Sequence, residues 1–193
     1  MNKHVLLSAL AGIAVSATAF SSVSEPAEGK KLKVVIIRHG EKPKEDEQGK
    51  IGDNLSCAGM NRALKLPHVL HHKFGKPDYT YVPSLTCGTF TDHSRMFQTV
   101  APLAIKYNLT VNSDFDEKAA AEVAHDVQQK EGTVLMVWEH SAIQSIAGEL
   151  GVENPPAWHG KDFDSIWIID FKSGKALLTM DQEGIDPSED CDF

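Results

Sequence analysis

The hydrophobic positions of this chain fall into two patterns. Apolar residues follow one another without a polar interruption in VVII at residues 34–37 and in VLMVW at residues 134–138. Uninterrupted apolar runs of this length are typical of interior strands in a sheet that is covered on both faces. We therefore expect interior strands over residues 32–37 and 133–138. Shorter apolar runs predict the other strands, which cover residues 78–82, 109–111, 165–170 and 175–180.

Between these strands the apolar residues recur at the spacing of an amphipathic helix. The first helix is expected over residues 56–74, with Ser56 as its N-cap and a kink at Pro67. Further helices are expected over residues 93–107, 117–130 and 142–150. Strands that alternate with helices favour right-handed crossovers and a mostly parallel central sheet. The predicted fold class is therefore α/β, a three-layer α/β/α sandwich.

The segments outside this pattern are assigned separately. Residues 1–19 contain Lys3, an apolar run and then small residues, which is the order found in an export signal peptide. The apolar run is short for a membrane span. Residues 20–31 are predicted to be a flexible leader, residues 32–180 the folded domain, and residues 181–193 an acidic tail, either frayed or laid on the surface. We expect an exported protein, periplasmic or secreted, with no membrane span after removal of the signal.

Charge and cysteine content narrow the class of partner and compartment. The chain has 19 Lys and Arg against 27 Asp and Glu, a formal net charge of -8. This balance disfavours nucleic acid and anionic membranes as partners. The cysteines are odd in number: Cys57, Cys87 and Cys191. In an oxidising compartment they allow one disulfide and one free thiol, and the sequence leaves the pairing open.

Charged and titratable side chains directly follow the two interior strands. Arg38 and His39 come directly after the first, and Glu139 and His140 come directly after the other. Because the carboxyl ends of parallel strands meet at one edge of a sheet, we expect these residues to lie close together. Arg95 falls in the first turn of a predicted helix, where a cation gains most if an anion is bound nearby. The pattern therefore predicts a phosphate site.

Four motifs carry a resemblance to a known family. In order and rough spacing they are similar to the signature elements of the histidine phosphatase superfamily, in its smaller branch, whose fold is called phosphoglycerate mutase-like. The motifs are RHGEK at residues 38–42, NLSCAGMNRALKL at residues 54–66, SRMFQTVAPLA at residues 94–104 and VLMVWEHSAI at residues 134–143.

The resemblance implies a role for each residue of the predicted site. His39 is the nucleophile, which becomes phosphohistidine. Arg38 and Arg95 hold phosphoryl oxygens through their guanidinium forks, and His140 holds a third edge. Gly40 allows the backbone to pass close to the substrate. Three or four cationic groups can replace a metal in phosphoryl transfer, so no metal and no cofactor is expected.

The general acid has no clean match to the family pattern. The first candidate is Glu139, directly before the second histidine, although adjacent residues at a strand end point to opposite faces. The second candidate is Asp116, from the segment VNSDFDEKAA. Asp114, Asp116 and Glu117 have an alternative interpretation as acids that complement the dipole of a helix N-terminus.

Other residues near the motifs receive a mainly structural interpretation. Glu41 is expected to position cationic groups rather than to do chemistry, Lys42 to be solvated, and Arg62 to be exposed on its helix. The segment at residues 155–167 either covers the site or packs its tryptophans on the sheet edge. The short chain lacks long insertions, and we expect an open pocket.

These expectations combine into one function and two alternatives. The predicted function is an exported, metal-independent phosphatase whose partner is a phosphomonoester, either a small molecule or a glycan. A phosphomutase is the first alternative, but it needs a closed, dry site. A phosphate-ester binding module of the same fold with weak or lost catalysis is the second, because the acid is not clearly matched.

Overall fold

A single six-stranded sheet runs through the molecule. The computed structural model describes residues 31–85 and 93–193. Across the sheet the strand order is β3-β2-β4-β1-β5-β6. The first four strands of this order run parallel, β5 is antiparallel to β1, and β6 is antiparallel to β5. The strands are β1 (Lys33–Arg38), β2 (Tyr79–Tyr81), β3 (Val111–Asn112), β4 (Thr133–Trp138), β5 (Ser165–Lys172) and β6 (Lys175–Gln182).

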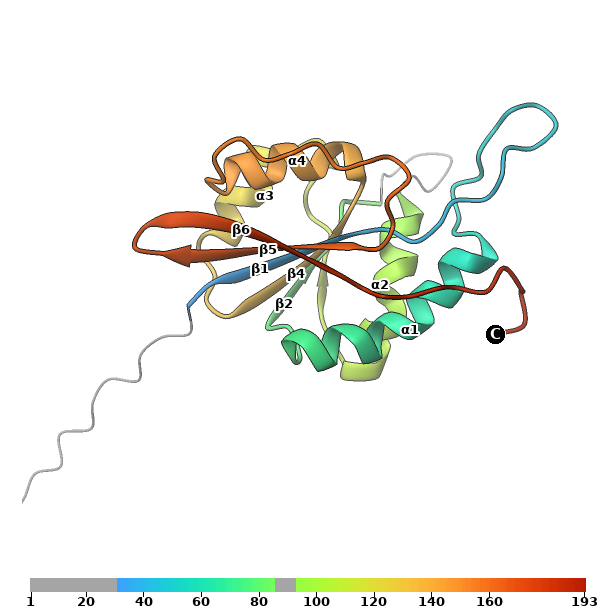
Figure 1. The fold of residues 1–193 in the computed structure, drawn as a ribbon, viewed down its shortest axis with the longest axis horizontal. Helices are drawn as coiled ribbons and strands as arrows, with labels where there is room; N and C mark the ends of the chain where they lie inside the picture. Colours follow the sequence, from blue (N-terminus) through green and yellow to red (C-terminus); the bar gives the residue numbers. More distant parts are fainter. Residues whose placement is uncertain (1–30, 86–92) are drawn as a thin grey trace, which may run out of the picture.

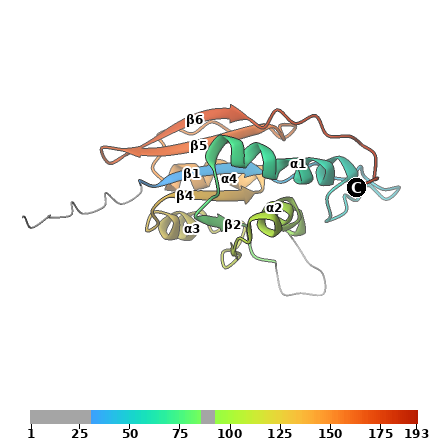
Figure 2. The ribbon, with the colours of Figure 1, turned by 90° about the horizontal axis from the view of Figure 1, so that it is seen from below.

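Helices cover both faces of the sheet, as the α/β/α prediction requires. Figures 1 and 2 show α1 and α2 on one face and α3 and α4 on the other. Each pair packs over its own apolar cluster, one lined by α1 and α2 and the other by α3 and α4. The predicted fold class is confirmed. The helices are α1 (Cys57–Phe74), α2 (Ser94–Tyr107), α3 (Ala120–Val127) and α4 (His140–Glu149).

The two interior strands pair directly with each other. β1 and β4 are parallel neighbours, and Arg38 lies opposite Trp138 at the carboxyl end of the pairing. The backbone N–H of His39 donates to the carbonyl of Trp138 at 3.2 Å, which extends the alignment by one residue. The chain segments that follow β1 and β4 therefore leave the sheet side by side.

Both faces of β1 are buried, which explains its unbroken apolar sequence. Val34 and Ile36 belong to the core under α3 and α4, whereas Val35 and Ile37 belong to the core under α1 and α2. None of the four side chains is more than 1% exposed. A strand held on both faces is a rigid support for whatever follows it.

Some element boundaries differ from the prediction for local reasons. β3 begins at Val111 rather than at residue 109, because the Leu109 N–H is already used on the carbonyl of Ala104 at the end of α2. α3 begins at Ala120 rather than at residue 117, because a turn in which Asp116 accepts the Lys118 N–H precedes it. α4 begins at His140, two residues early, and β6 continues to residue 182.

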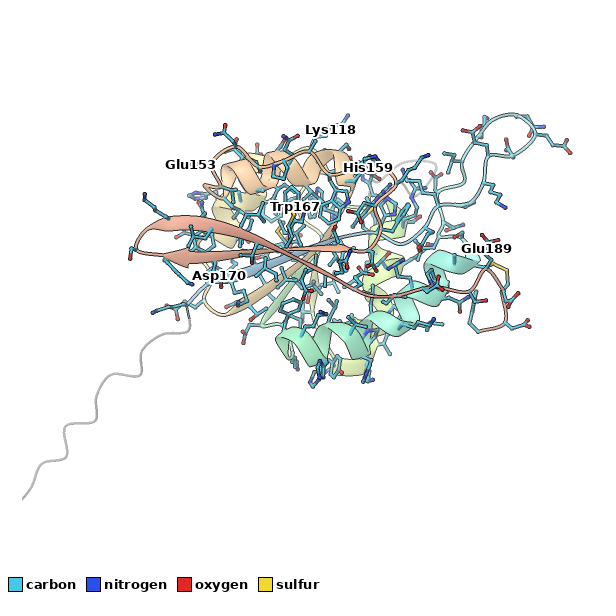
Figure 3. The ribbon with its side chains drawn as sticks, in the orientation of Figure 1. Lys118, Glu153, His159, Trp167, Asp170 and Glu189 are labelled. Atoms are coloured by element: carbon cyan, nitrogen blue, oxygen red, sulfur yellow. A yellow bond between two sulfur atoms is a disulfide. The ribbon has the colours of Figure 1, made fainter. Side chains whose placement is uncertain are left out.

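The C-terminal tail lies along α1 rather than frayed in solvent (Figure 2). Two of its residues, Glu183 and Ile185, are buried. Asn61 of α1 donates to the carbonyls of tail residues 188 and 190. A disulfide joins Cys57, the first residue of α1, to Cys191; Figure 3 shows this bond in yellow beside Glu189.

Several predictions concern parts of the chain outside the described residues. They are the signal peptide at residues 1–19, nearly all of the leader at residues 20–31, and Cys87. Within residues 31–85 and 93–193, no helix is both long and apolar enough to cross a membrane.

Candidate active site

His39 stands at the centre of the edge where β1 and β4 end. Its side chain has no exposed surface. Its Nδ1 lies 2.6 Å from the carbonyl oxygen of Gly40, and its Nε2 lies 2.8 Å from Oε2 of Glu139. Because a carbonyl oxygen only accepts, Nδ1 carries a proton and Nε2 is the nitrogen directed into the site. Burial lowers the pKa of the His39 imidazole, although the hydrogen bond to Glu139 opposes this effect.

The Glu139 carboxylate contacts three basic groups. Besides His39, it contacts Nδ1 of His140 through Oε1, and Nζ of Lys42 lies 3.6 Å from Oε2. Burial alone would raise the pKa of Glu139, but the hydrogen bond from His39 and the charges of Lys42 and His140 hold it well below its ordinary value. The carboxylate is therefore ionised in this arrangement.

Arg38 is buried beside His39 and is held by backbone and an aromatic ring. Its Nη1 donates to the carbonyls of Gly160 at 2.8 Å and Asp162 at 3.1 Å. Its guanidinium carbon lies 3.8 Å from the centre of the Phe163 ring, a cation–π contact. Its Nε is buried and has no hydrogen-bond partner among the described residues. Arg38 thus keeps one donor available in the interior.

The second predicted arginine reaches the same region from α2. Arg95 is the second residue of α2, and its Nη1 donates to the carbonyl of Gly52 at 2.7 Å. Its Nε is also buried and unpaired within the described part of the chain. Thr99 of α2 accepts the Gly40 N–H and donates to the Arg95 carbonyl, so this helix start lies against the segment after β1. Burial lowers the pKa of Arg38, and the nearby charge of Arg95 acts in the same direction.

Gly40 is required by close packing against α1. A Cβ at this position would lie 2.8 Å from the carbonyl oxygen of Gly59 in α1. A Cβ on Gly59 would in turn lie 2.5 Å from the carbonyl oxygen of Glu41. The two glycines allow α1 to press its backbone against the segment that carries His39.

The alternative acid, Asp116, differs from its neighbour Glu117 in exposure. Asp116 is exposed and its side chain serves the turn before α3. Glu117 is less exposed: its carboxylate pairs with Nε2 of His93 at 2.7 Å, and its carbonyl accepts the indole N–H of Trp138 at the end of β4. The structure thus brings Glu117, one of the acids that the sequence offered in this segment, toward the strand edge.

Arg62 corrects the prediction of an exposed helical arginine, because only 4% of it is accessible. It donates to both carboxylate oxygens of Glu41, to Asp164 and Glu183, and to the carbonyl of Ile185. The spacing of residues along the helix could have predicted that Arg62 is buried. Arg62 lies three residues after the buried Gly59 and four before the buried Leu66 of the same helix, so it falls on the apolar face.

The loop between α4 and β5 both packs on the sheet and covers the site. Trp158 packs against Trp167 of β5 in a tilted arrangement, with ring centres 5.2 Å apart. Phe163 covers Arg38 and lies 6.0 Å from the His39 ring, and a Cβ on Gly160 would lie 3.5 Å from His140. Figure 3 shows His159 of this loop near the start of α4. The prediction of an open pocket is wrong at His39, because the His39 side chain is enclosed.

Comparison of the whole chain with known proteins gives matches in structure alone. No protein-family model and no curated protein matches the sequence. The solved structure of the protein histidine phosphatase SixA with tungstate aligns with a TM-score of 0.57 at 16% identity, over 78% of this chain and 97% of SixA. The chain has the phosphoglycerate mutase-like fold. The resemblance seen in its motifs is thereby confirmed at the level of the fold.

Two further structures with this fold agree. A mutant phosphoserine phosphatase from Entamoeba histolytica, in complex with phosphoserine, aligns with a TM-score of 0.51 at 15% identity, over 79% of this chain and 97% of its own. A phosphoglycerate mutase from Bacillus anthracis aligns with a TM-score of 0.50 at 12% identity, over 85% of this chain and 95% of its own. The phosphoglycerate mutase-like chain described here is similar to phosphatases and to a mutase, so the fold alone does not select the reaction.

Proposed function

We propose that this chain is an exported, metal-independent phosphatase that hydrolyses phosphomonoesters through a phosphohistidine intermediate on His39. One observation carries the proposal. The imidazole of His39 is buried with Nδ1 fixed on a carbonyl, and its Nε2 points toward a cluster that contains Arg38 and His140. Since a carboxylate only accepts, the bond between Nε2 and the ionised Glu139 requires a proton on Nε2, and this nitrogen becomes the nucleophile when the proton passes to Glu139.

In the first step Nε2 attacks phosphorus, a P–N bond forms, and the P–O bond to the leaving group breaks. Arg38, Arg95 and His140 neutralise the charge on the phosphoryl oxygens. The buried Nε atoms of Arg38 and Arg95, which have no partner among the described residues, are donors that a phosphoryl oxygen would satisfy. Two guanidinium groups and the imidazole of His140 in an enclosed site supply the electrostatic role that a metal plays elsewhere.

The leaving oxygen needs a proton, and Glu139 is the first candidate to deliver it. Its carboxylate is within 2.8 Å of the reacting nitrogen, whereas Asp116, the second candidate, is exposed. Glu139 is ionised in the resting arrangement, and the proton that it takes up as the substrate enters comes from Nε2 of His39, which leaves the imidazole neutral. In the second step water attacks phosphohistidine, the P–N bond breaks, and the Glu139 carboxylate accepts the proton of the water.

The substrate is a phosphomonoester of a small molecule or a glycan. Export, inferred from residues 1–19, places the chain in the periplasm or outside the cell. The binding-module alternative is favoured by one specific observation: an ionised Glu139 leaves His39 without a protonated carboxyl group beside it.

Hydrolysis of p-nitrophenyl phosphate in the presence of a chelator separates these possibilities. We expect activity in the wild-type chain and its loss, by about 10³-fold or more, in His39→Ala. His72→Ala, at an exposed position of α1, is the matched control and should retain full activity. Quenching with denaturant at alkaline pH during turnover should trap phosphate on the wild-type chain, and later acidification should release it, because phosphohistidine is stable to base and labile to acid. Hydrolysis that survives His39→Ala would contradict the mechanism, and phosphate binding without turnover would favour the binding module.

A further inference from the structure

We propose that the Glu139 carboxylate occupies the position of the substrate phosphoryl group in the resting site, so that an oxyanion binds only by displacing it. The inference rests on the proposed function because it assumes that Nε2 of His39 is the attacking atom. It concerns binding, however, and its test does not depend on turnover.

The first argument is spatial. An attacking nitrogen must approach phosphorus to about 3–3.5 Å along the direction of its lone pair. Oε2 of Glu139 already lies 2.8 Å from Nε2 of His39, in that direction. The His39 side chain has no exposed surface, and its other nitrogen is used on the Gly40 carbonyl. A phosphoryl group therefore reaches Nε2 only where the carboxylate now sits.

The second argument is the set of groups that the carboxylate contacts. Its two oxygens bridge the imidazoles of His39 and His140, and Lys42 approaches one of them. His39 and His140 are two of the groups assigned to the phosphoryl group in the proposed mechanism. A carboxylate with two oxygens on these donors imitates one edge of a phosphoryl group.

The third argument is the place of Glu139 in the fold. It is the N-cap residue of α4, yet its side chain makes no capping hydrogen bond. Glutamate is a poor N-cap, and here its side chain turns to His39 instead. The helix start favours negative charge at this point, whether it comes from a carboxylate or from a phosphate.

Replacement of the Glu139 carboxylate by an oxyanion is favourable because the carboxylate leaves buried hydrogen-bond donors of the site unsatisfied. With Glu139 in place, the buried Nε atoms of Arg38 and Arg95 have no partner in the described part of the chain. A phosphoryl group has more oxygens and more charge than a carboxylate and can satisfy these donors as well. The competition weakens binding of every oxyanion, including the inorganic phosphate that hydrolysis releases, and so favours product release.

The test is calorimetric titration of inorganic phosphate, and separately of vanadate, into three forms of the full chain. Glu139→Gln keeps the shape of the side chain and removes the competing charge. Glu153→Gln removes the same charge on an exposed residue remote from the start of α4, as Figure 3 shows, and is the matched control. We expect Glu139→Gln to bind both anions about tenfold more tightly than wild type, within the usual range of coupling between two ligands. Glu153→Gln should stay within about twofold of wild type.

A second measurement uses the wild-type chain alone and so does not depend on the variant folding. The hydrogen bond between His39 and Glu139 should give a downfield imidazole proton signal in NMR spectra, and saturating phosphate should remove it. Persistence of this signal in the phosphate complex would overturn the proposal. So would equal or weaker phosphate affinity in a folded Glu139→Gln. Tighter binding by Glu139→Gln in a chain that hydrolyses nothing would support the inference while the phosphatase proposal fails.

Discussion

Two arginines of this molecule are almost equally buried and are used in opposite ways. Arg38 is 2% exposed and Arg62 is 4% exposed. Arg62 donates to three carboxylates and one carbonyl, whereas Arg38 donates to two carbonyls, lies against a ring and keeps an unpaired Nε. A guanidinium saturated by fixed carboxylates fastens segments together. A guanidinium that hydrogen-bonds to no fixed carboxylate can still attract an anion that binds reversibly.

The Arg62 cluster joins distant parts of the chain. Glu41 follows His39 and Gly40, Asp164 precedes β5, and Glu183 follows β6. All three carboxylates lie within 3.3 Å of the Arg62 guanidinium. Three carboxylates share one cation, so one of them is favoured to hold a proton. Burial raises the pKa of Glu183 to about 8, in spite of the charge of Arg62 and with support from Asp164 and Glu41. Its Oε1 has no partner among the described residues, which suits a neutral carboxyl group better than an ionised one.

The largest effect is expected from Arg62→Ala. Removal of the only guanidinium in this cluster leaves three carboxylates together in a largely buried place, which should lower the free energy of unfolding by about 3–5 kcal/mol. Chemical denaturation monitored by circular dichroism measures the loss. Lys65→Ala, which removes an exposed bond from α1 to the tail, is the control and should cost less than about 1 kcal/mol. A small loss in Arg62→Ala would mean that the cluster does not fasten the tail.

The same substitution at both arginines sharpens the comparison. Lysine keeps the positive charge and loses the planar fork. We expect Arg38→Lys to reduce p-nitrophenyl phosphate hydrolysis by about 10²–10³-fold with little change in the midpoint of denaturation. Arg62→Lys should do the reverse, with a lower midpoint and activity per folded molecule within about threefold of wild type. Equal effects of the two variants on activity would remove the distinction.

The smallest effect is a pH dependence that belongs to the Arg62 cluster. Because the pKa of Glu183 is about 8 in the folded chain against an ordinary value of 4.5, the folded state holds a proton that the unfolded state has lost between these values. The stabilisation is complete below about pH 4.5 and is lost as the pH rises through about 8. Compared with Glu183→Gln, the wild-type chain should lose stability progressively between pH 5 and pH 8. Parallel stability curves would show that Glu183 does not titrate in this range.

The sequence pattern predicted the parts of the fold whose causes are local. Two unbroken apolar runs predicted that β1 and β4 are buried on both faces. Because the two strands are parallel, the residues that follow them lie at one edge of the sheet. The N-cap at Ser56 was also predicted, and its side chain accepts the N–H of Gly59 in the structure. The start of β3 was missed because the competing bond of Leu109 to the end of α2 has no signature in hydrophobic spacing.

Contacts between distant segments could not be predicted in the same way. Arg62 and Glu183 are 121 positions apart, and nothing in either local sequence points to the other. The direction of the Glu139 side chain was likewise open, because alternation along a strand separates it from the adjacent His140, whereas in the structure its carboxylate contacts both His39 and His140. Enclosure of His39 depends on Phe163, which lies in a loop without periodicity.

The disulfide between Cys57 and Cys191 also carries a consequence for how the protein is made. Cys87 lies between the two partners in the sequence, so oxidation in the order of synthesis would first join the wrong pair. The native bond would then require thiolate exchange to release Cys87, a reaction that disulfide isomerases accelerate. Production in a host compartment that supplies such a catalyst should therefore favour correctly matured molecules over misbridged ones.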